Sequence, residues 1–527
     1  MIPIRVIDSW NPNYLHIKKK IARFRAPTYP QSPNRVCFEK VAHSKDDMMN
    51  FKGCRGTVIL ISAALICLAP EIGSAYEEGT AAPEAPIAST ASKGQVATEA
   101  PESQISTIAA SEAQVTSVTS SEAQITSVEE VSTGNYSRFP FRVSVSVRGG
   151  YDDNVNTSKI NKQDSTFTNG SAAITYDFGS PRTQLSLQTG GGVTYYWDHL
   201  RNIGINNNDY DFNVYLGLQV VHKLSPRLTW TSNDYLTYQT EPDFTLAVGL
   251  NRRSGNFFYT QDKSTIAYLW TPRFSTATSS TFVAVRYDDS GVGFFEDRIE
   301  STVGNEFRFL LWPTTTLVAE GRVQFVSYSH DGDQTGPPIL LANGSTFVPR
   351  FRRDSMTYFA LGGFDHAFSS RLSASVRGGA EFREYDNSLE ATDQSAPYFE
   401  GTLNYAVGKN TSVSWTNRYA IEEPDVQLNP SRTTFRTGLR AKHDFTARIS
   451  GNVGAYYEHD DYDSVNSFTV ISPSFTEEAF DAAVSLRFAV TRYLGIEAGF
   501  NHTEVWSDIF LREYSRNRYW GGVNFLF

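Results

Sequence analysis

Apolar and polar residues alternate along the chain from Phe139 to its end, in stretches separated by polar turns and loops. An alternation with period two places successive side chains on opposite faces of a β-strand. Each stretch is about 10 to 15 residues long, which suits strands that cross a bilayer at a tilt. The pattern predicts an all-β domain over residues 139–527 in which every strand has one apolar and one polar face.

Two kinds of connection separate these stretches. Tight junctions carry Pro, Gly, Ser or Asn, which favour turns, and often have an aromatic residue before the turn and an Arg after it. They lie at 179–182, 224–227, 270–273, 312–315, 368–371, 407–410, 445–448 and 490–493. Longer polar loops lie at 154–165, 198–208, 241–255, 288–296, 330–351, 386–396, 422–431, 460–475 and 507–515.

Together these connections predict about 18 strands, with 16 or 20 as the alternatives if one hairpin is miscounted. An even number of strands puts both ends of the sheet on one side of the membrane, as in bacterial single-chain barrels. The expected fold class is therefore all-β, a transmembrane antiparallel up-and-down β-barrel. The tight turns would lie at the periplasmic rim, where aromatic residues form an interfacial girdle.

Parity assigns the two faces of each strand. In the first strand Phe141 and Val147 would face lipid, which leaves Arg142 and Arg148 inside. Arg or Lys on the lipid face costs about 2–4 kcal/mol near mid-membrane, so we expect charged strand residues to face the lumen. The candidate lumen-lining residues are Arg142, Arg148, Glu300, Glu306, Arg308, Glu320, Arg322, Arg377, Glu381, Arg418, Arg436 and Arg440.

These charges allow two interpretations. Opposed Arg and Glu side chains across a water-filled pore would favour polar, hydrated solutes. Alternatively, they form ion pairs between neighbouring strands that brace the wall. The loop His330–Phe351 is the candidate for a loop folded into the lumen, with a surface loop as the alternative.

The last strand resembles the C-terminal signal that the barrel-assembly machinery reads. Tyr519, Val523, Phe525 and Phe527 share one side of its alternation, and Phe527 is the last residue of the chain. A bare apolar strand at the end of a soluble domain would invite aggregation. The pattern indicates a protein of the bacterial outer membrane.

The composition agrees with a β-barrel rather than a helical membrane protein. The 527 residues include 13% aromatics and only 3 Cys, with a net charge of −10 and a mean hydropathy of −0.35. A spanning strand is apolar on one face only, so its mean hydropathy stays low. Nothing in this composition points to nucleic acid.

The segment 1–75 reads as an N-terminal extension followed by a secretory signal peptide. The apolar run Thr57–Ala69 is too short to span a bilayer, follows Lys52 and Arg55, and precedes the small residues 73–75. Met48 or Met49 is the expected true start, with an unusually long n-region as the alternative. Cys37, Cys54 and Cys67 all precede the expected mature start near Tyr76.

Residues 76–138 are rich in Ala, Ser, Thr, Glu and Pro and contain two imperfect repeats, at 111–118 and 121–128. Such a composition buries too little apolar surface to offset the entropy of ordering. We expect a low-complexity periplasmic linker, with a short helix or a partner-docking segment as the alternative.

Acidic residues recur after aromatics where strands enter the long loops. Weak metal-ligand candidates among them are Asp152, Asp153, Asp288 and Asp289, whose carboxylates could bind Ca²⁺ or cations that bridge lipopolysaccharide. Solvated loop acids are the alternative. No cofactor is expected, and the scattered His residues form no catalytic arrangement, so the chain is not expected to be an enzyme.

The segment Val143–Asn156, with Tyr151-Asp-Asp-Asn at the strand end, is similar to the opening of the putative β-barrel porin 2 family. That resemblance implies an outer-membrane conduit, in a family of which some members are linked to export of polysaccharide. The expectation is a channel that passes hydrophilic solutes, with secreted polysaccharide as one such solute. Expected partners are outer-membrane lipid, lipopolysaccharide, the barrel-assembly machinery and polysaccharide-export proteins. The alternative function is a closed structural or surface-anchoring barrel without transport.

Overall fold

The computed structural model describes residues 141–198, 209–240, 255–331, 339–340, 346–347, 352–386, 391–426, 429–466 and 471–527. The expected extension, signal peptide and linker lie outside these residues, as does most of the loop His330–Phe351. Within the described part, no helix is long and apolar enough to cross a membrane.

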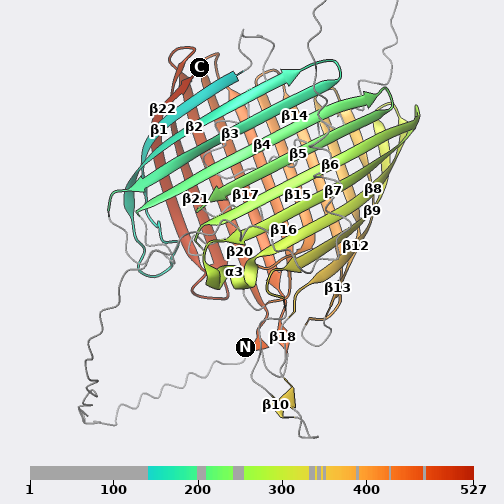
Figure 1. Ribbon diagram of the computed structural model, residues 1–527. Coiled ribbons are helices and arrows are strands. Elements are labelled where there is room, and N and C mark those ends of the chain that lie inside the picture. Colours follow the sequence, from blue (N-terminus) through green and yellow to red (C-terminus); the bar gives the residue numbers. More distant parts are fainter. Residues whose placement is uncertain are drawn as a thin grey trace, which may run out of the picture. The chain divides into compact units, whose positions relative to one another are not determined.

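The described chain forms one 18-stranded antiparallel sheet that closes on itself (Figure 1). The first nine of its strands are β1 (Phe141–Asp152), β2 (Ser165–Gly179), β3 (Thr183–Tyr196), β4 (Tyr210–Ser225), β5 (Leu228–Gln239), β6 (Phe257–Thr271), β7 (Phe274–Tyr287), β8 (Arg298–Trp312) and β9 (Thr315–Tyr328). The other nine are β12 (Ser355–Ser369), β13 (Leu372–Tyr385), β14 (Gln394–Val407), β15 (Thr411–Glu422), β16 (Arg432–Asp444), β17 (Ile449–Tyr462), β20 (Phe475–Ala489), β21 (Leu494–Ser507) and β22 (Tyr514–Leu526).

The barrel closes between its first and last strands. β1 pairs antiparallel with β22, with Val145 opposite Phe525 and Val147 opposite Val523. The terminal Phe527 extends the pairing, since it exchanges backbone hydrogen bonds of 2.8 and 3.1 Å with Val143. Closure pairs the edges that an open sheet would expose. The predicted strand number and up-and-down order are confirmed.

Each predicted tight junction connects two neighbouring strands at the end of the barrel that also holds the C-terminus (Figure 1). A hydroxyl side chain holds most of these turns by accepting the backbone N–H of the residue three positions on. Ser225 accepts from Leu228 at 3.0 Å, Thr271 from Phe274 at 3.0 Å and Ser369 from Leu372 at 3.1 Å. The same bond recurs at Ser180, Thr446 and Thr491.

Large aromatic residues surround this rim on the outside. Trp270, Trp312, Phe368 and Phe445, each next to a turn, are 56–61% exposed. Exposed aromatics at this level are what the polar boundary of a membrane favours. Between the rims the outer face carries exposed apolar residues such as Leu216, Ile266 and Leu439.

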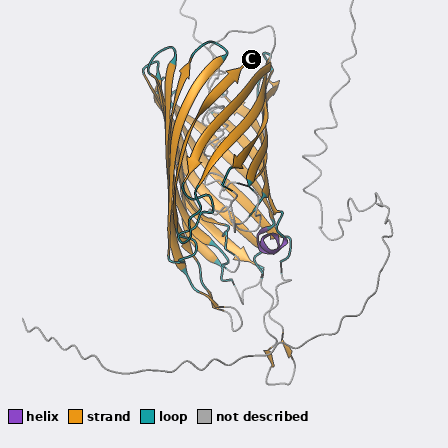
Figure 2. Ribbon diagram, turned by 90° about the vertical axis from the view of Figure 1, so that its left-hand side faces the viewer, coloured by secondary structure: helices purple, strands orange, loops and turns teal. Residues whose placement is uncertain are grey.

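The long connections contain structure that the sequence pattern did not predict. The expected loop 288–296 forms a short helix, α3 (Ser290–Glu296), whose N-cap Asp289 accepts from the backbone N–H groups of Gly291 and Val292. Figure 2 shows this helix at the end of the barrel opposite the C-terminus. Two small hairpins, β10 (Ile339–Leu340) with β11 (Thr346–Phe347) and β18 (Val465–Asn466) with β19 (Ile471–Ser472), lie within other long loops.

Two loop boundaries differ from the prediction by three residues. β14 begins at Gln394, inside the expected loop 386–396, and β17 continues to Tyr462, past the expected loop start at residue 460. In both places polar residues continue the strand because their neighbours supply pairing partners: Gln394 lies opposite Arg383, and Tyr462 lies opposite Arg432.

Candidate functional site: the barrel interior

The parity of the strands places the predicted lumen residues on the inner face, and most of them are ion-paired. Arg308 contacts Glu306 at 2.6 Å, and Arg322 contacts both Glu320 and Glu400. Two further residues hydrogen-bond elsewhere: Glu381 accepts the backbone N–H of Ile421 at 2.6 Å, and Arg440 contacts the hydroxyl of Tyr456. The remaining pairs are Arg142 with Asp177, Arg148 with Glu497, Glu300 with Arg298, Arg377 with Asp365, Arg418 with Glu422 and Arg436 with Glu458.

Some of these ion pairs join neighbouring strands, whereas others, such as Arg308 with Glu306 and Arg322 with Glu320, lie two residues apart on one strand. Arg436 on β16 lies opposite Glu458 on β17, and Glu400 on β14 lies opposite both Arg377 and Arg418. Residues directly opposite each other on one face of a sheet are close enough to interact. Ion pairs of this kind therefore connect neighbouring strands of the wall through their side chains. We call the inner face of β8 to β22, together with β1, the ion-paired wall.

One pair of this wall crosses the seam where the barrel closes. Arg148 on β1 and Glu497 on β21 both lie opposite Gly522 on β22, and they meet at 2.6 Å with little exposure. A Cβ at position 522 would come within 2.3 Å of the carbonyl oxygen of Val147 and 2.9 Å of Cγ of Arg148. Glycine is required here because the backbone of β1 and the side chain of Arg148 both lie where a Cβ would be.

Arg432 is the centre of the most buried cluster. Its side chain is 1% exposed and contacts Asp460 at 2.7 Å, Glu458 at 3.3 Å and Glu422 at 3.7 Å. Arg436 contacts the same Glu458 and Glu422, at 2.7 and 3.2 Å. Arg418 lies 3.5 Å from the same Glu422, so three cations and three anions share one site in which each charge has an opposite neighbour, which burial of charge requires.

The segment 423–426, which follows β15, folds inward rather than away from the barrel. Glu423 accepts from the hydroxyl of Tyr328 on β9 at 2.6 Å and pairs with Arg383 on β13 at 2.9 Å. Asp425 accepts from the hydroxyl of Tyr462 on β17 at 2.5 Å and pairs with Arg512, from the β21–β22 connection, at 2.8 Å. These contacts reach from β9 to the approach of β22, so residues 423–426 form a bridge across the interior.

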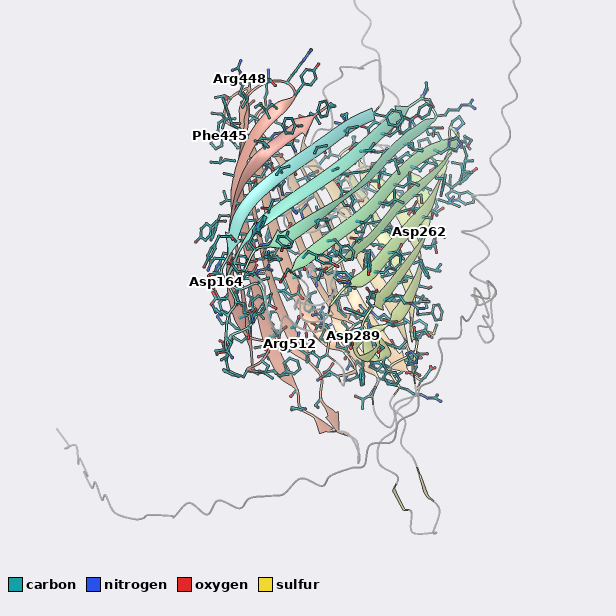
Figure 3. All side chains as sticks on the ribbon, turned by 60° about the vertical axis from the view of Figure 1, so that its left-hand side comes forward. Asp164, Asp262, Asp289, Phe445, Arg448 and Arg512 are labelled. Carbon is teal, nitrogen blue, oxygen red and sulfur yellow. The ribbon has the colours of Figure 1, made fainter. Side chains whose placement is uncertain are left out.

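The charges of this bridge are set by its surroundings. Burial by itself would raise the pKa of Asp425, but the neighbouring guanidinium groups of Arg512 and Arg432 hold that pKa well below its ordinary range. Arg512 also contacts Glu477 at 2.7 Å. Figure 3 labels Arg512 toward the end of the barrel where it also labels Asp289, the N-cap of α3. The bridge thus lies at the long-loop end, and each of its two acids has an arginine partner.

The connection that contains α3 carries a second inward contact. Arg353 lies over the ring of Tyr328 at 4.0 Å, bonds to the carbonyl oxygen of Phe295 and lies 3.7 Å from Glu296. Burial raises the pKa of Glu296, and the nearby Arg353 only partly opposes this. The ends of β7, β9 and β12 are therefore tied together on the same side as the bridge.

The inner face of β2 to β7 differs from the ion-paired wall, because it is almost free of charge. Its side chains are mostly amides, hydroxyls, tyrosines and small or apolar residues. Among the described strand residues of this face, Lys263 is the charged group at mid-height, and Asp177, Asp211 and Lys223 lie near the strand ends. Gln219 lies opposite Asn233, and Asn233 lies opposite Lys263. Tyr215 lies flat, with its hydroxyl 2.7 Å from where a Cβ of Gly190 would be. We call this face the uncharged wall.

The acidic residues considered as metal ligands have structural partners. Asp152 pairs with Arg516 at 2.6 Å and with Arg518 at 3.3 Å. Asp153 accepts from the backbone and side chain of Asn517 at 2.6 and 2.7 Å, and Asp288 accepts from Tyr238 and Asn256. Asp289 caps α3. Among the described residues no group of three or more His, Cys, Asp or Glu side chains could hold a metal ion.

The residues of the expected assembly signal lie on the outer face of β22. Tyr519, Phe525 and Phe527 are 37–66% exposed, and Val523 lies between them on the same side. Trp520, at an inward position, lies under the guanidinium of Arg148 at 4.5 Å. The outer face of the last strand is therefore free of lumen contacts, and its role in assembly remains a prediction.

The closed barrel, its apolar outer band and its polar interior define a porin-like protein of the bacterial outer membrane. Residues 297–527, from the start of β8 to the end of the chain, match the model of the family described as "Putative beta-barrel porin 2". This is the family that the sequence resemblance suggested, although the matched residues do not include the first strand, which carried that resemblance. No curated protein matches the chain.

Solved structures of outer-membrane barrels are similar at low identity. The outer membrane protein OpdK of Pseudomonas aeruginosa is 9% identical, with a TM-score of 0.36 over 73% of this chain and 99% of that chain. OccK2 (OpdF) of the same organism, solved with glucuronate, is 8% identical, with a TM-score of 0.38 over 73% and 97%. The siderophore receptor PirA of Pseudomonas aeruginosa is 7% identical, with a TM-score of 0.33 over 75% and 81%. Likeness at this level carries no information on the solute.

Sequence reasoning missed the bridge and the split between the two walls. The bridge residues Glu423, Pro424 and Asp425 resemble any acidic loop in the sequence, and only their distant partners distinguish them. The split was readable in principle, since inward positions of β2 to β7 carry Gln, Asn, Ser, Thr and Tyr where later strands carry Arg and Glu. A comparison of inward positions strand by strand would have found it.

Proposed function

We propose that the protein is a passive outer-membrane channel for hydrophilic solutes, and that an uncharged, hydroxyl-rich polymer such as a secreted polysaccharide is its main solute. The uncharged wall is the observation that carries this proposal. Amide and hydroxyl groups exchange hydrogen bonds with sugar hydroxyls, and tyrosine rings offer apolar faces to sugar rings. Many weak contacts of this kind let a chain enter and leave, which conduction requires.

The ion-paired wall has a different part in this proposal. Its Arg and Glu side chains satisfy one another, so they contribute stiffness and a nearly balanced charge rather than a strong field. This favours a neutral solute over an ionic one, because balanced pairs attract neither sign. The expectation that Arg and Glu themselves contact the solute is replaced by contacts along β2 to β7.

A closed anchoring barrel is the second candidate, and the bridge is the observation that favours it. Residues 423–426 cross the interior and are fixed by buried ion pairs. A permanently docked bridge would narrow the lumen toward the ion-paired side. The two candidates differ in whether ions and sugars pass at all.

Reconstitution in planar bilayers separates them. The channel predicts stepwise conductance, and the double variant Gln219→Glu with Asn233→Asp should shift the selectivity toward cations, since it adds two acids beside Lys263. Asn161→Asp, on the exposed β1–β2 loop, is the matched control and should leave selectivity unchanged. Absence of conductance steps from folded protein would favour the anchoring barrel.

The solute class needs its own measurement. Liposome swelling should be faster with neutral oligosaccharides than with anionic ones of equal size, and deletion of the gene should abolish surface polysaccharide without altering uptake of small solutes. Equal rates for neutral and anionic sugars together with unchanged polysaccharide would remove the polymer from the proposal and leave a general pore.

A further inference from the structure

Two acidic residues face outward away from the ends of their strands, although charged strand residues are expected to face the lumen there. Asp234 on β5 and Asp262 on β6 lie directly opposite each other, and Asp262 also lies opposite Phe282 of β7, which is 37% exposed on the outer face. Ile266 and Trp270 share the parity of Asp262 and are among the most exposed apolar residues, whereas Phe257 and Tyr259, which have the opposite parity, are buried inside. Both carboxyl groups therefore belong to the outer face.

Their depth places them inside the apolar band rather than at its edge. Asp262 is four residues from Phe258 toward the long loops and eight from Trp270 toward the tight turns. A strand rising about 3.3 Å per residue at a tilt of about 40° climbs roughly 2.5 Å per residue. The carboxyl groups thus lie about 10 Å from the aromatic level near the long loops and about 20 Å from the aromatic level near the tight turns. Figure 3 labels Asp262 at the middle of the barrel's height.

Other outward charges on the described strands behave differently. Arg286, Glu384, Asp461, Glu478 and Glu504 all lie within four residues of the long-loop ends of their strands, where headgroups and water are in reach. Asp234 and Asp262 are the exception.

Lipid chains cannot satisfy this pair. Ser232 donates to Oδ1 of Asp234 at 3.0 Å and contacts Oγ of Ser264 at 3.3 Å, and the side chains of Asp234 and Asp262 hydrogen-bond each other. Polar groups in hydrocarbon are costly and are normally turned toward protein. Lipopolysaccharide headgroups and bridging cations would meet the barrel at its rim, about 10 Å away.

Hydrogen-bond donors lie beside the acids on the same outer band. Thr278 and Ser280 on β7 are exposed, and the hydroxyl of Thr278 donates to Oδ1 of Asn305 on β8 at 3.0 Å. Ser280 lies two residues from Phe282 on the same face of β7, toward the tight turn. Because the strands tilt, residues at one height shift toward the tight turns from β6 to β8, so Ser280 and Asn305 lie near the level of Asp262. We call Ser232, Asp234, Asp262, Ser264, Thr278, Ser280 and Asn305 the polar outer patch.

The carboxyl groups of this patch lie on β5 and β6, and its exposed hydroxyls and its amide lie on β7 and β8. We propose that the patch is the interface between two copies of this chain, related by a two-fold axis along the membrane normal at the β6–β7 boundary. Such an axis brings the carboxyl groups of one copy onto the hydroxyl and amide groups of the other, twice. A self-complementary surface of this kind is what an isologous contact needs.

Disulfide trapping in intact outer membranes tests the geometry. In a background with Cys37, Cys54 and Cys67 replaced by Ser, Ser280→Cys lies next to the axis and should link to its own counterpart under mild oxidation. Leu439→Cys, exposed on β16 across the barrel, is the matched control and should not link. A product of another mass, which would identify a different partner, or no product from folded Ser280→Cys, overturns the proposal.

A second variant tests the chemistry. Asp234→Leu with Asp262→Leu removes the acceptors and leaves lipid-compatible side chains, so the barrel should stay folded and heat-modifiable on gels. The yield of the Ser280→Cys dimer should fall at least tenfold. Unchanged yield from the folded leucine variant would show that the acids do not hold the copies together. Neither result depends on what the lumen conducts.

Discussion

Replacing Asp425 with alanine should release the bridge across the barrel interior. The carboxylate of Asp425 has two strong contacts: Arg512 at 2.8 Å and the hydroxyl of Tyr462 at 2.5 Å. Breaking a buried ion pair by removing one partner typically costs 3–5 kcal/mol. Arg512 keeps Glu477 as a partner, so we expect the lower end, about 3 kcal/mol, which is roughly a factor of 150 in the docking equilibrium.

Asp425→Asn grades the same perturbation. The amide oxygen can still accept from Tyr462, so only the charge is lost, and we expect about 1.5 kcal/mol. A combined Asp425→Ala and Arg512→Gln variant should cost less than the sum of the single changes, because each single change already removes the pair.

Single-channel recording is the assay, with conductance and open-channel noise as the readouts. Asp425→Ala should give larger or more frequently fluctuating steps than the native protein, and Asp425→Asn should lie between them. Asp508→Asn, an exposed acid in the same connection as Arg512, is the control and should conduct like the native protein. Native steps and native noise from folded Asp425→Ala would refute the idea that residues 423–426 restrict the lumen.

Three further predictions concern stability, measured by urea or thermal unfolding of the barrel in detergent. Gly522→Val should prevent closure of the β1–β22 seam and abolish heat-modifiable migration, whereas Gly521→Ala, whose Cβ would meet nothing closer than 3.8 Å, should be tolerated. Arg432→Met leaves three carboxylates short of a cation and should cost about 3–5 kcal/mol; a loss under 1 kcal/mol would mean that water replaces the guanidinium. Burial raises the pKa of Asp354 to about 6, although the hydrogen bond from the backbone N–H of Tyr328 partly opposes this rise. The folded state therefore holds this proton more tightly than the unfolded chain, so stability should fall by about 1 kcal/mol as pH rises from 5 to 7.5, after allowance for its partial exposure. Asp354→Asn should remove that part of the pH dependence, and an unchanged pH profile in this variant would exclude Asp354 as its source.

The sequence by itself determined the barrel. Period-two alternation, turn residues such as Ser225, Thr271 and Ser369, and aromatics beside the turns are local signals. Each acts within one strand or one hairpin, so the strand number and the two faces of each strand could be read without knowing which strands meet. Parity placed Arg148 and Arg436 inside for the same reason, since the cost of a charge against lipid depends on the face alone.

Only the tertiary structure decided what those charges do. Arg148 meets Glu497 because closure brings β1 to β21 across Gly522, and Asp425 meets Arg512 because two loops fold into one interior. These partners are separated by 349 and 87 residues, and no local pattern encodes such distances. For Asp234 and Asp262, parity alone predicts that both side chains face outward. Only the register shows that the two acids lie opposite each other at the depth of the lipid chains. Local alternation fixes which side of a strand a residue occupies, whereas its partners depend on closure, register and the folding of loops into the lumen.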